Sequence, residues 1–161
     1  MSHASPQHEF ACRLVWTGAT KGGTTSYETY SRECRVDFQG KPSLRGTSAP
    51  AFRGDPALTN PEDLLVASLS MCHFLSYVAL CARKGIAVIA YEDAATGRME
   101  RTGKTFQFTE VMLRPRVTIA PGSDPDLARS LHERARQECF ISNSVNFPVR
   151  HEPAISVAAP V

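Results

Sequence analysis

NPEDLLVASLSMCHFLSYVALCARKG, residues 60–85, decides the fold because it is the longest uninterrupted helical pattern in the chain. Asn60 is a favourable N-cap, Pro61 suits the first helical position, and two acidic residues follow where the helix dipole favours negative charge. Gly85 suits the position just past a helix end, where the backbone turns left-handed. The sequence therefore predicts a helix of about 24 residues, ~36 Å long.

Apolar side chains cover most of the circumference of this predicted helix. They include Leu65, Val66, Leu69, Cys72, Phe74, Tyr77, Ala79, Leu80 and Cys81. A helix that is apolar on every side is normally buried in the core of a protein. We therefore expect a central helix that is buried nearly all round.

Length and composition are typical of an ordinary globular protein. The chain of 161 residues suits one well-filled core and is short for two ordinary domains. We expect a single domain over residues 1–161, with residues 1–8 as a loose tail. A hydrophobic fraction of 42%, 21% charged residues and a net charge of +2 argue against disorder and against a nucleic-acid partner.

The N-terminal segment MSHASPQHEF lacks the positive charge and apolar run of a secretory signal. No stretch in the sequence approaches the roughly 18 apolar residues that are needed to cross a membrane. We therefore expect a cytoplasmic location and no membrane partner.

The chain has five cysteines, at positions 12, 34, 72, 81 and 139. Their odd number and the lack of any C-x-x-C spacing argue against a disulfide framework and against a ribbon-type zinc site. In a reducing compartment such thiols are expected to be buried or reactive.

The remaining sequence predicts strands and one more helix. Strands are expected within 9–18, 24–41, 86–99 (with Gly97 in a turn), 106–120 (a pair, or one strand bent at Pro115) and 148–159, a loop with at most one short strand over 42–58, and a helix over 124–139. This order predicts an α+β fold in which helices cover one side of an antiparallel sheet.

Cys72 lies near the middle of the long predicted helix, where a cysteine more often packs in the core than reacts. Cys139 lies at the end of the second predicted helix. Two helices packed on one sheet could bring these thiols together, which would require Cα atoms within roughly 7 Å for a disulfide. Spacing alone leaves this pairing a hypothesis.

Three motifs, in register, resemble the OsmC/Ohr family of thiol-dependent hydroperoxide reductases. They are TNPEDLL at 59–65, the cysteine ten residues after Glu62, and CFISN at 139–143. In that family N-P-E-x-L opens the central helix and a second cysteine commonly lies in C-P-x-S-N. The order of elements is similar from about residue 9 to residue 158. Phe140 replaces the usual proline, and His73 follows the first cysteine.

The resemblance implies that Cys72 is the peroxidatic thiol, Cys139 the resolving thiol and Glu62 the acidic partner of an activating arginine. Peroxide is attacked by a thiolate, and a nearby guanidinium lowers the thiol pKa. The resulting sulfenic acid would condense with the second thiol, and an external dithiol or lipoyl-type reductant would restore the enzyme. The implied substrate is an organic hydroperoxide, and neither a metal nor an organic cofactor is required.

The activating arginine is expected in the loop that precedes the long helix. Arg53 lies seven residues before Asn60, close to where OsmC-type members of the family carry theirs. Arg45 and Arg32 are the alternatives, because Ohr-type members carry the arginine in an earlier loop.

Glu62 cannot reach Cys72 within its own helix, because ten residues correspond to ~15 Å of rise and about 80° of rotation. If two copies of the helix pack antiparallel, the start of one lies beside the middle of the other. We therefore expect an intertwined homodimer with shared active sites, as the resemblance also implies.

The neighbouring side chains allow other interpretations. His73 points about 100° away from Cys72, which favours a core or supporting role, and Cys12, Cys34 and Cys81 are expected to pack. Phe74, Tyr77 and Phe147 could wall a pocket for an organic peroxide.

Two functions of other classes compete with the peroxidase. One is a protein on the same scaffold that binds a small apolar molecule or senses oxidants. The other is a metal-binding protein that uses Cys72, His73, His132 and Cys139, which is disfavoured because adjacent ligands diverge on a helix.

Overall fold

The computed structural model describes residues 7–160 of the chain. The chain folds as two compact units, which divide between Asp63 and Leu64. The prediction of one domain over residues 1–161 stays a prediction, and residues 1–6 of the expected tail lie outside the described residues.

The first unit is built on a three-stranded antiparallel sheet. Its strands are β1 (Arg13–Trp16), β2 (Cys34–Asp37) and β3 (Leu44–Gly46), in the order β1-β2-β3. The short strand β3 lies in the predicted loop 42–58. The predicted strands 9–18 and 24–41 are both much longer than the observed ones, and residues 24–33 form turns and coil.

The contacts of Arg32 explain why residues 24–33 do not form part of the predicted strand. Its guanidinium donates hydrogen bonds to the backbone carbonyls of Tyr27 and Tyr30, at 2.7 and 3.0 Å. It also lies over both tyrosine rings, 4.8 and 4.0 Å from their centroids. These side-chain contacts use backbone acceptors that a strand would pair with its neighbour.

The long helix is α1 (Pro61–Arg83), and its predicted ends are confirmed within two residues. At its start Asp63 N donates to Asn60 Oδ1 at 2.9 Å, and Asn60 N donates to Asp63 Oδ2 at 3.3 Å. These reciprocal bonds satisfy two backbone donors at the helix start. Gly85 has φ of +73° just past the end, as the sequence predicted.

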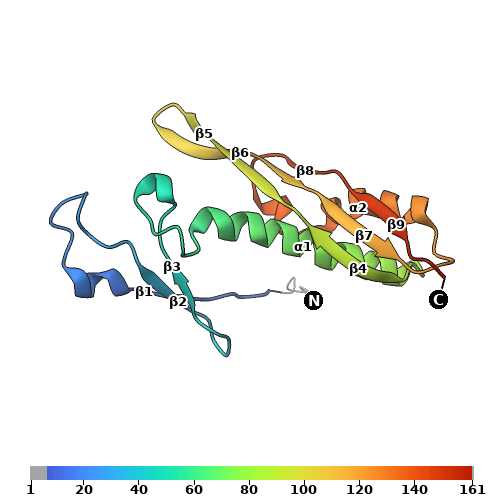
Figure 1. Ribbon diagram of the computed structural model, residues 1–161, viewed down its shortest axis with the longest axis horizontal. Helices are drawn as coiled ribbons and strands as arrows, with labels where there is room; N and C mark the ends of the chain where they lie inside the picture. Colours follow the sequence, from blue (N-terminus) through green and yellow to red (C-terminus); the bar gives the residue numbers. More distant parts are fainter. Residues whose placement is uncertain (1–6, 161) are drawn as a thin grey trace, which may run out of the picture. The chain divides into compact units, whose positions relative to one another are not determined.

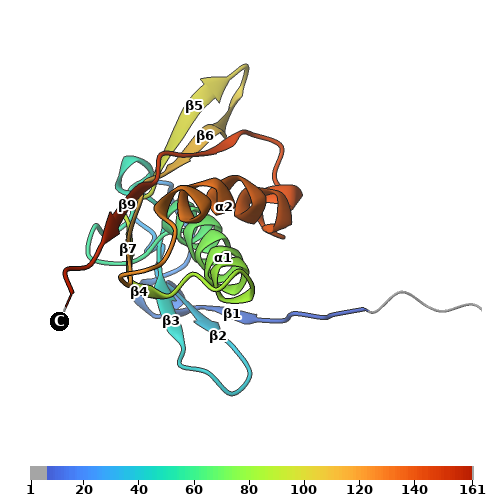
Figure 2. The same cartoon turned by 90° about the vertical axis from the view of Figure 1, so that its right-hand side faces the viewer.

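The second unit contains two more three-stranded sheets and a second helix. One sheet has the order β4-β7-β9, from β4 (Val88–Asp93), β7 (Pro115–Ile119) and β9 (Ala154–Val157). The other has the order β5-β6-β8, from β5 (Thr96–Thr102), β6 (Thr105–Leu113) and β8 (Val149–His151). Helix α2 (Pro125–Glu138) has Asp124 as its N-cap, and the side chain of this residue accepts hydrogen bonds from two backbone N–H groups. Figure 2 shows α1 and α2 on the same side of the β4-β7-β9 sheet, and Figure 1 shows this sheet along α1.

The α+β class and the two helices are confirmed, whereas three details of the strand prediction are wrong. The two sheets of the second unit are mixed, because β8 and β9 pair in parallel with β6 and β7. The region 148–159 forms these two short strands instead of one. Gly97 lies inside β5 instead of in a turn, where an added Cβ would meet Phe108 at 2.6 Å and Val66 at 2.7 Å. At 106–120 the observed arrangement is the strand pair β6 and β7.

Helix α1 is only partly buried within one chain. Tyr77, Leu80 and Cys81 pack in a core cluster with residues of β7 and α2. On another side Met71 and Leu75 are 62% and 56% exposed. The expectation of burial nearly all round is therefore not met by a single chain.

Helix α1 is also long and apolar enough to cross a membrane, judged by length and composition alone. This corrects the expectation that no stretch approaches such a span. Its side chains Leu69 and Tyr77 are nevertheless fully buried against other parts of the second unit. The helix therefore packs as a core helix of this fold.

Candidate active site

The structure brings Cys72 and Cys139 together. Cys72 lies in the middle of α1 and is half-buried, whereas Cys139 is the C-cap of α2 and is fully buried. The Cys139 side chain lies near enough to Cys72 to raise the pKa of the Cys72 thiol. The predicted pair of thiols thus lies where the end of α2 meets the middle of α1.

A tight turn holds Cys139 in place after α2. The backbone N–H of Ser142 donates to Cys139 Sγ at 3.4 Å, and that of Asn143 donates to the Cys139 carbonyl at 3.1 Å. The Asn143 side chain donates to the Gln137 carbonyl at 2.9 Å and so closes the end of the helix. The asparagine of the CFISN motif therefore has a structural role through its side chain, whereas Ser142 contributes its backbone N–H.

The surroundings of Cys72 favour the protonated thiol. Burial raises the pKa of Cys72, and a hydrogen bond with the Cys139 side chain raises it further. Backbone hydrogen bonds from Ile141 and Phe140 act in the opposite direction. The part of the candidate site that lies in the second unit therefore contains both thiols. Taken together, its residues do not lower the pKa of Cys72 and so do not favour the thiolate.

A pocket of about 740 Å³ adjoins Cys72. It is lined by Ser68, Met71, Cys72, Leu75, Ser76, Ala79, Arg83, Gln137, Glu138, Phe140, Ile141 and Asn143. Its α1 residues recur at the three- to four-residue spacing of one helix face. Glu138 is paired with Arg134 at 2.6 Å, so Arg83 is the unpaired charge of this lining among the described residues. The pocket is therefore mainly apolar, with a cation at the end of α1.

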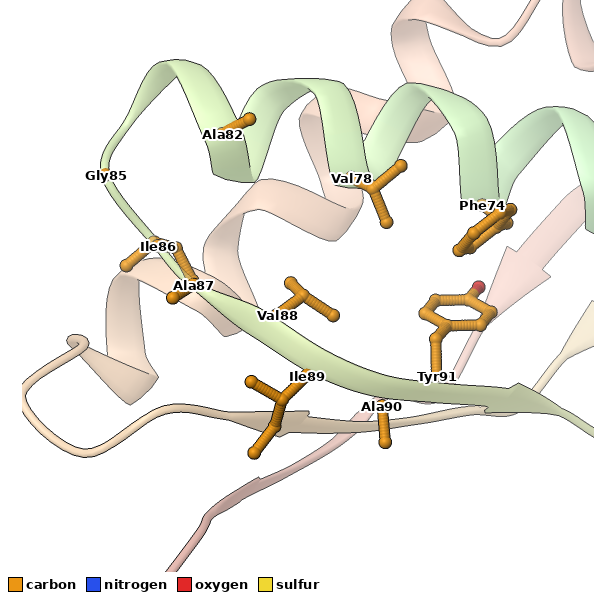
Figure 3. A pocket seen from close by; sticks show the side chains of 10 residues that line it. All are labelled: Phe74, Val78, Ala82, Gly85, Ile86, Ala87, Val88, Ile89, Ala90 and Tyr91. Atoms are coloured by element: carbon orange, nitrogen blue, oxygen red, sulfur yellow. The ribbon is translucent and has the colours of Figure 1, made fainter.

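A second pocket of about 750 Å³ lies on another side of α1. Figure 3 shows Phe74, Val78 and Ala82 of the helix facing residues 85–91, with Phe74 above the ring of Tyr91. The centroids of these two rings are 4.8 Å apart. This pocket contains no thiol, and Tyr91 carries its only ionisable side chain.

The three aromatics that were expected to wall the peroxide pocket do not line the pocket at Cys72. Phe74 lines the second pocket, and Tyr77 is fully buried in the core. Phe147 packs on Phe108, with ring centroids 5.6 Å apart. The apolar wall at Cys72 comes instead from side chains such as Met71 and Leu75, which the helical spacing from Cys72 could have indicated.

His73 is fully buried, which confirms its predicted place in the core. Its Nε2 lies 3.0 Å from Nδ1 of His132 on α2, which is also fully buried. The ring of His151 on β8 is 5.7 and 6.0 Å from these two rings, and its Nε2 lies 3.3 Å from Glu133 Oε2. The sequence suggested His73 and His132 only as possible metal ligands, and it gave no sign that His151 on β8 lies beside them.

The histidine cluster is not a metal site as it stands. No group of three or more His, Cys, Asp or Glu side chains within residues 7–160 is arranged to hold a metal ion. Burial is the main cause that lowers the pKa of His73 to about 4 and that of His132 to about 3. Both imidazoles are therefore neutral near pH 7.

The candidate arginines belong to the first unit and differ in how they are held. Arg45 is paired with Glu33 at 3.1 Å. Arg32 is committed to the carbonyls of Tyr27 and Tyr30 described above. Arg53 is exposed, and its guanidinium makes no hydrogen bond or ion pair among the described residues but lies 5.7 Å from the Tyr27 ring centroid. Arg53 therefore has the most available guanidinium of the three.

Arg53 also has an unusual backbone. Its φ of +66° is the only positive φ of a non-glycine residue among residues 7–160. Such conformations are uncommon for residues with a Cβ and are enriched at functional sites.

Glu62 is the second residue of α1 and is only partly exposed. Its Oε2 atom is buried and has no hydrogen-bond partner among the described residues. An unpaired buried carboxylate oxygen is costly and calls for a donor. Glu62 belongs to the first unit and Cys72 to the second, so their approach stays a prediction.

Comparison with known proteins places the chain among OsmC-like proteins. The model of the family described as OsmC-like protein matches residues 54–153, which contain both Cys72 and Cys139. The uncharacterized protein YmaD of Bacillus subtilis is 26% identical over 102 residues, which are 62% of this chain and 68% of YmaD.

Solved structures with the same fold cover nearly the whole chain. An OsmC-like protein of unknown function from Vibrio cholerae has a TM-score of 0.84 and 29% identity, over 92% of this chain and 100% of that one. The organic hydroperoxide resistance protein OsmC of Legionella pneumophila has a TM-score of 0.69 and 18% identity, over 95% and 100% of the two chains. An organic hydroperoxide resistance protein of Elizabethkingia anophelis has a TM-score of 0.68 and 19% identity, over 96% and 100%. The last two likenesses show the shared fold.

Proposed function

This chain belongs to the OsmC-like protein family, and we propose that it is a thiol-dependent peroxidase that reduces organic hydroperoxides. The observation that carries the proposal is the pairing of the Cys72 and Cys139 thiols at the wall of an apolar pocket. The relatives from Legionella and Elizabethkingia that share the fold are organic hydroperoxide resistance proteins, which agrees with this chemistry.

The proposed reaction starts when the Cys72 thiolate attacks one oxygen of the peroxide. The O–O bond breaks, that oxygen stays on the sulfur as a sulfenic acid, and the other leaves and takes up a proton as an alcohol. The Cys139 thiol then attacks the Cys72 sulfur. The S–O bond breaks, the disulfide forms, and hydroxide leaves as water with the Cys139 proton. Pairing the thiols in advance favours this second step.

Activation of Cys72 requires a cation, because burial raises its pKa. We assign this role to Arg53, whose guanidinium is available, and we assign Glu62 to hold it through the unpaired Oε2. Because Glu62 and Cys72 are separated by ~15 Å of helix, both groups would come from a second copy of the chain. The exposed side chains of Met71 and Leu75 on α1 give that copy an apolar surface to cover.

The proposed enzyme needs an external reductant but neither a metal nor an organic cofactor. The reductant would be a dithiol or a lipoyl-type molecule, because thiol–disulfide exchange returns both cysteines to thiols. We place the protein in the cytoplasm, where the reducing environment keeps its five cysteines as thiols. We propose no nucleic-acid or membrane partner.

Thiol counting tests this function. The reduced protein is treated with one equivalent of tert-butyl hydroperoxide, and free thiols are counted before and after. The expected result is the loss of two thiols per chain and an intrachain disulfide between Cys72 and Cys139. A protein that keeps all five thiols would contradict the proposal.

The raised pKa of Cys72 favours a second candidate of another class, in which the protein binds a small apolar molecule in the pocket without turnover. If the protein only binds such a molecule, the number of free thiols per chain should stay the same after peroxide treatment. The same thiol count therefore separates the two functions.

A further inference from the structure

The His73–His132 pair is a buried polar contact between the two helices that carry the thiols. Both side chains are fully buried, and Nε2 of His73 lies 3.0 Å from Nδ1 of His132. The other ring nitrogen of each residue is buried without a partner among the described residues. Burying two half-satisfied imidazoles costs free energy that two apolar side chains would not. The pair therefore needs a reason other than stability.

The position of the pair connects it to the thiols. His73 follows Cys72 directly on α1. Cys139 comes seven residues after His132, and seven residues of helix return to within about 20° of the same side. The hydrogen bond therefore joins the turn of α1 that carries Cys72 to the side of α2 that leads to Cys139.

A second contact lies next to the first. The Tyr77 ring stacks on His132, with centroids 3.8 Å apart, and its hydroxyl donates to the Ala128 carbonyl at 3.1 Å. Tyr77 lies one turn after His73, and Ala128 lies one turn before His132. The stacked ring holds the plane of the His132 imidazole, and a phenylalanine ring at this position would keep the stacking without the hydroxyl.

A hydrogen bond suits this task because it is directional. Apolar contacts tolerate small rotations of a helix, whereas an N–H···N bond weakens steeply when its angle or distance changes. Reactions between held groups are sensitive to such shifts, and a misplacement of ~1 Å can cost about 100-fold in rate.

We infer that the His73–His132 hydrogen bond is the positioning contact for disulfide formation, because it holds α2 on α1 in the register that keeps Cys139 against Cys72. The inference rests on the proposed peroxidase function and concerns its second step, in which Cys139 displaces water from the Cys72 sulfenic acid. Neither histidine touches the reacting sulfurs in this step, so both are positioning residues.

Two matched pairs of substitutions separate the hydrogen bond from packing. His73→Gln keeps a polar atom near the place of Nε2, and His132→Asn keeps one near the place of Nδ1. His73→Met and His132→Leu have similar sizes to these but cannot form the bond. Tyr77→Phe is the control, because it loses the neighbouring hydroxyl and leaves the histidine pair intact.

The fate of Cys72 is the readout. Each reduced full-length variant is mixed with one equivalent of tert-butyl hydroperoxide and quenched with dimedone at set times. Mass spectrometry then counts the Cys72 thiol, its dimedone adduct, its sulfinic acid and the disulfide. We expect His73→Met and His132→Leu to lose the Cys72 thiol at the wild-type rate but to form the disulfide roughly tenfold or more slowly. Sulfinic acid should accumulate, because the sulfenic acid survives longer.

The conservative variants and the control decide the outcome. His73→Gln and His132→Asn should recover most of the disulfide rate, and Tyr77→Phe should keep it. Wild-type rates of disulfide formation in His73→Met and His132→Leu would overturn the inference. It would also be overturned if His73→Gln and His132→Asn were slowed as much as their apolar counterparts. Equal slowing in Tyr77→Phe would overturn it as well. If His73→Met does not fold, the His132 pair makes the same comparison. A wild-type protein that never loses its Cys72 thiol would contradict the proposed function itself, and the inference with it.

Discussion

Cys139 lies near enough to Cys72 to raise the pKa of its thiol, although the two residues are 67 positions apart in the chain. The half-buried thiol on α1 meets the fully buried thiol at the end of α2. This difference in exposure assigns their order, because a peroxide in the pocket can reach Cys72 but not the buried Cys139. The first oxidation is therefore expected on Cys72.

Cys72→Ser should abolish peroxide consumption while the protein keeps its fold. Serine is nearly the same size as cysteine, but its hydroxyl is not ionised near neutral pH. The measurement is the rate of tert-butyl hydroperoxide loss with a dithiol reductant, together with a circular dichroism spectrum. Cys81→Ser on the same helix, in the core away from the pocket, is the control for a lost thiol. More than a small fraction of wild-type activity in Cys72→Ser would remove Cys72 from the mechanism.

Cys139→Ser should stop the reaction after the first oxidation. The Cys72 sulfenic acid then has no neighbouring thiol and proceeds to sulfinic acid as more peroxide is added. Mass spectrometry of Cys72 after a peroxide titration measures this directly. An unchanged intrachain disulfide in this variant would mean that another cysteine resolves the sulfenic acid.

The histidine pair predicts a loss of stability on mild acidification. Burial lowers the pKa of His73 to about 4 and that of His132 to about 3, whereas an unfolded histidine titrates near ~6.5. The unfolded chain therefore binds protons first as the pH falls below ~6.5. The stabilisation is complete above that pH and is lost as the pH falls toward 4 and then 3, with up to about 1.4 kcal/mol per pH unit for each histidine.

Urea unfolding between pH 7 and pH 5 measures this slope in a range where most carboxylates stay ionised. The neighbouring charges act in both directions: His151 faces both imidazoles, Arg129 faces His132, and Asp93 favours protonation of His73. The double variant His73→Gln, His132→Asn should have a much flatter dependence. Equal slopes for this variant and the wild type would contradict the assignment to the pair.

The sequence predicted those parts of the fold that depend on neighbouring residues. The ends of α1 and α2 were recognisable because their caps, Asn60, Asp124 and Gly85, act within a few positions of the helix they limit. The thiol pair was suggested by a resemblance in spacing, and its contact needed the structure.

Features that depend on contacts between distant segments could not be predicted in the same way. Residues 24–33 have the composition of a strand, but Arg32 draws the tyrosine carbonyls into a turn. Gly97 is typical of a turn but is required inside β5 because Phe108 and Val66 approach so closely. Phe74 and Cys72 are two positions apart on α1, so they point about 160° apart and line different pockets.

Arg53→Ala should raise the pKa of Cys72 and slow its first oxidation. An adjacent cation typically lowers an acid's pKa by about one to three units, so its loss predicts a rate roughly tenfold or more lower near pH 7. The measurement is the pH dependence of Cys72 alkylation by iodoacetamide, together with the peroxide rate. Arg45→Ala is the matched control, since Arg45 is engaged by Glu33. If Arg53→Ala is oxidised at the wild-type rate and Arg45→Ala or Arg32→Ala is oxidised slowly, the activating role belongs to the arginine whose loss slows the reaction.

Each complete active site is expected to be shared between two chains. The ~15 Å of helix between Glu62 and Cys72 implies that each complete site takes Glu62 and Arg53 from one chain and Cys72 from the other. Glu62→Ala and Cys72→Ser chains should each be inactive alone but active when their subunits are allowed to exchange. One site of each mixed dimer then joins the intact Cys72 of the first chain to the intact Glu62 of the second.

Random exchange of equal amounts makes about half of the dimers mixed, each with one complete site of two, which predicts roughly a quarter of wild-type activity. Native mass spectrometry with one isotope-labelled variant measures the exchange independently of activity. A mixture of Cys72→Ser with Cys139→Ser is the negative control, because both thiols belong to the same half of the site and no mixed dimer pairs them correctly. Demonstrated exchange without recovery would show that one chain builds the whole site, and Glu62 would then have to act within its own chain.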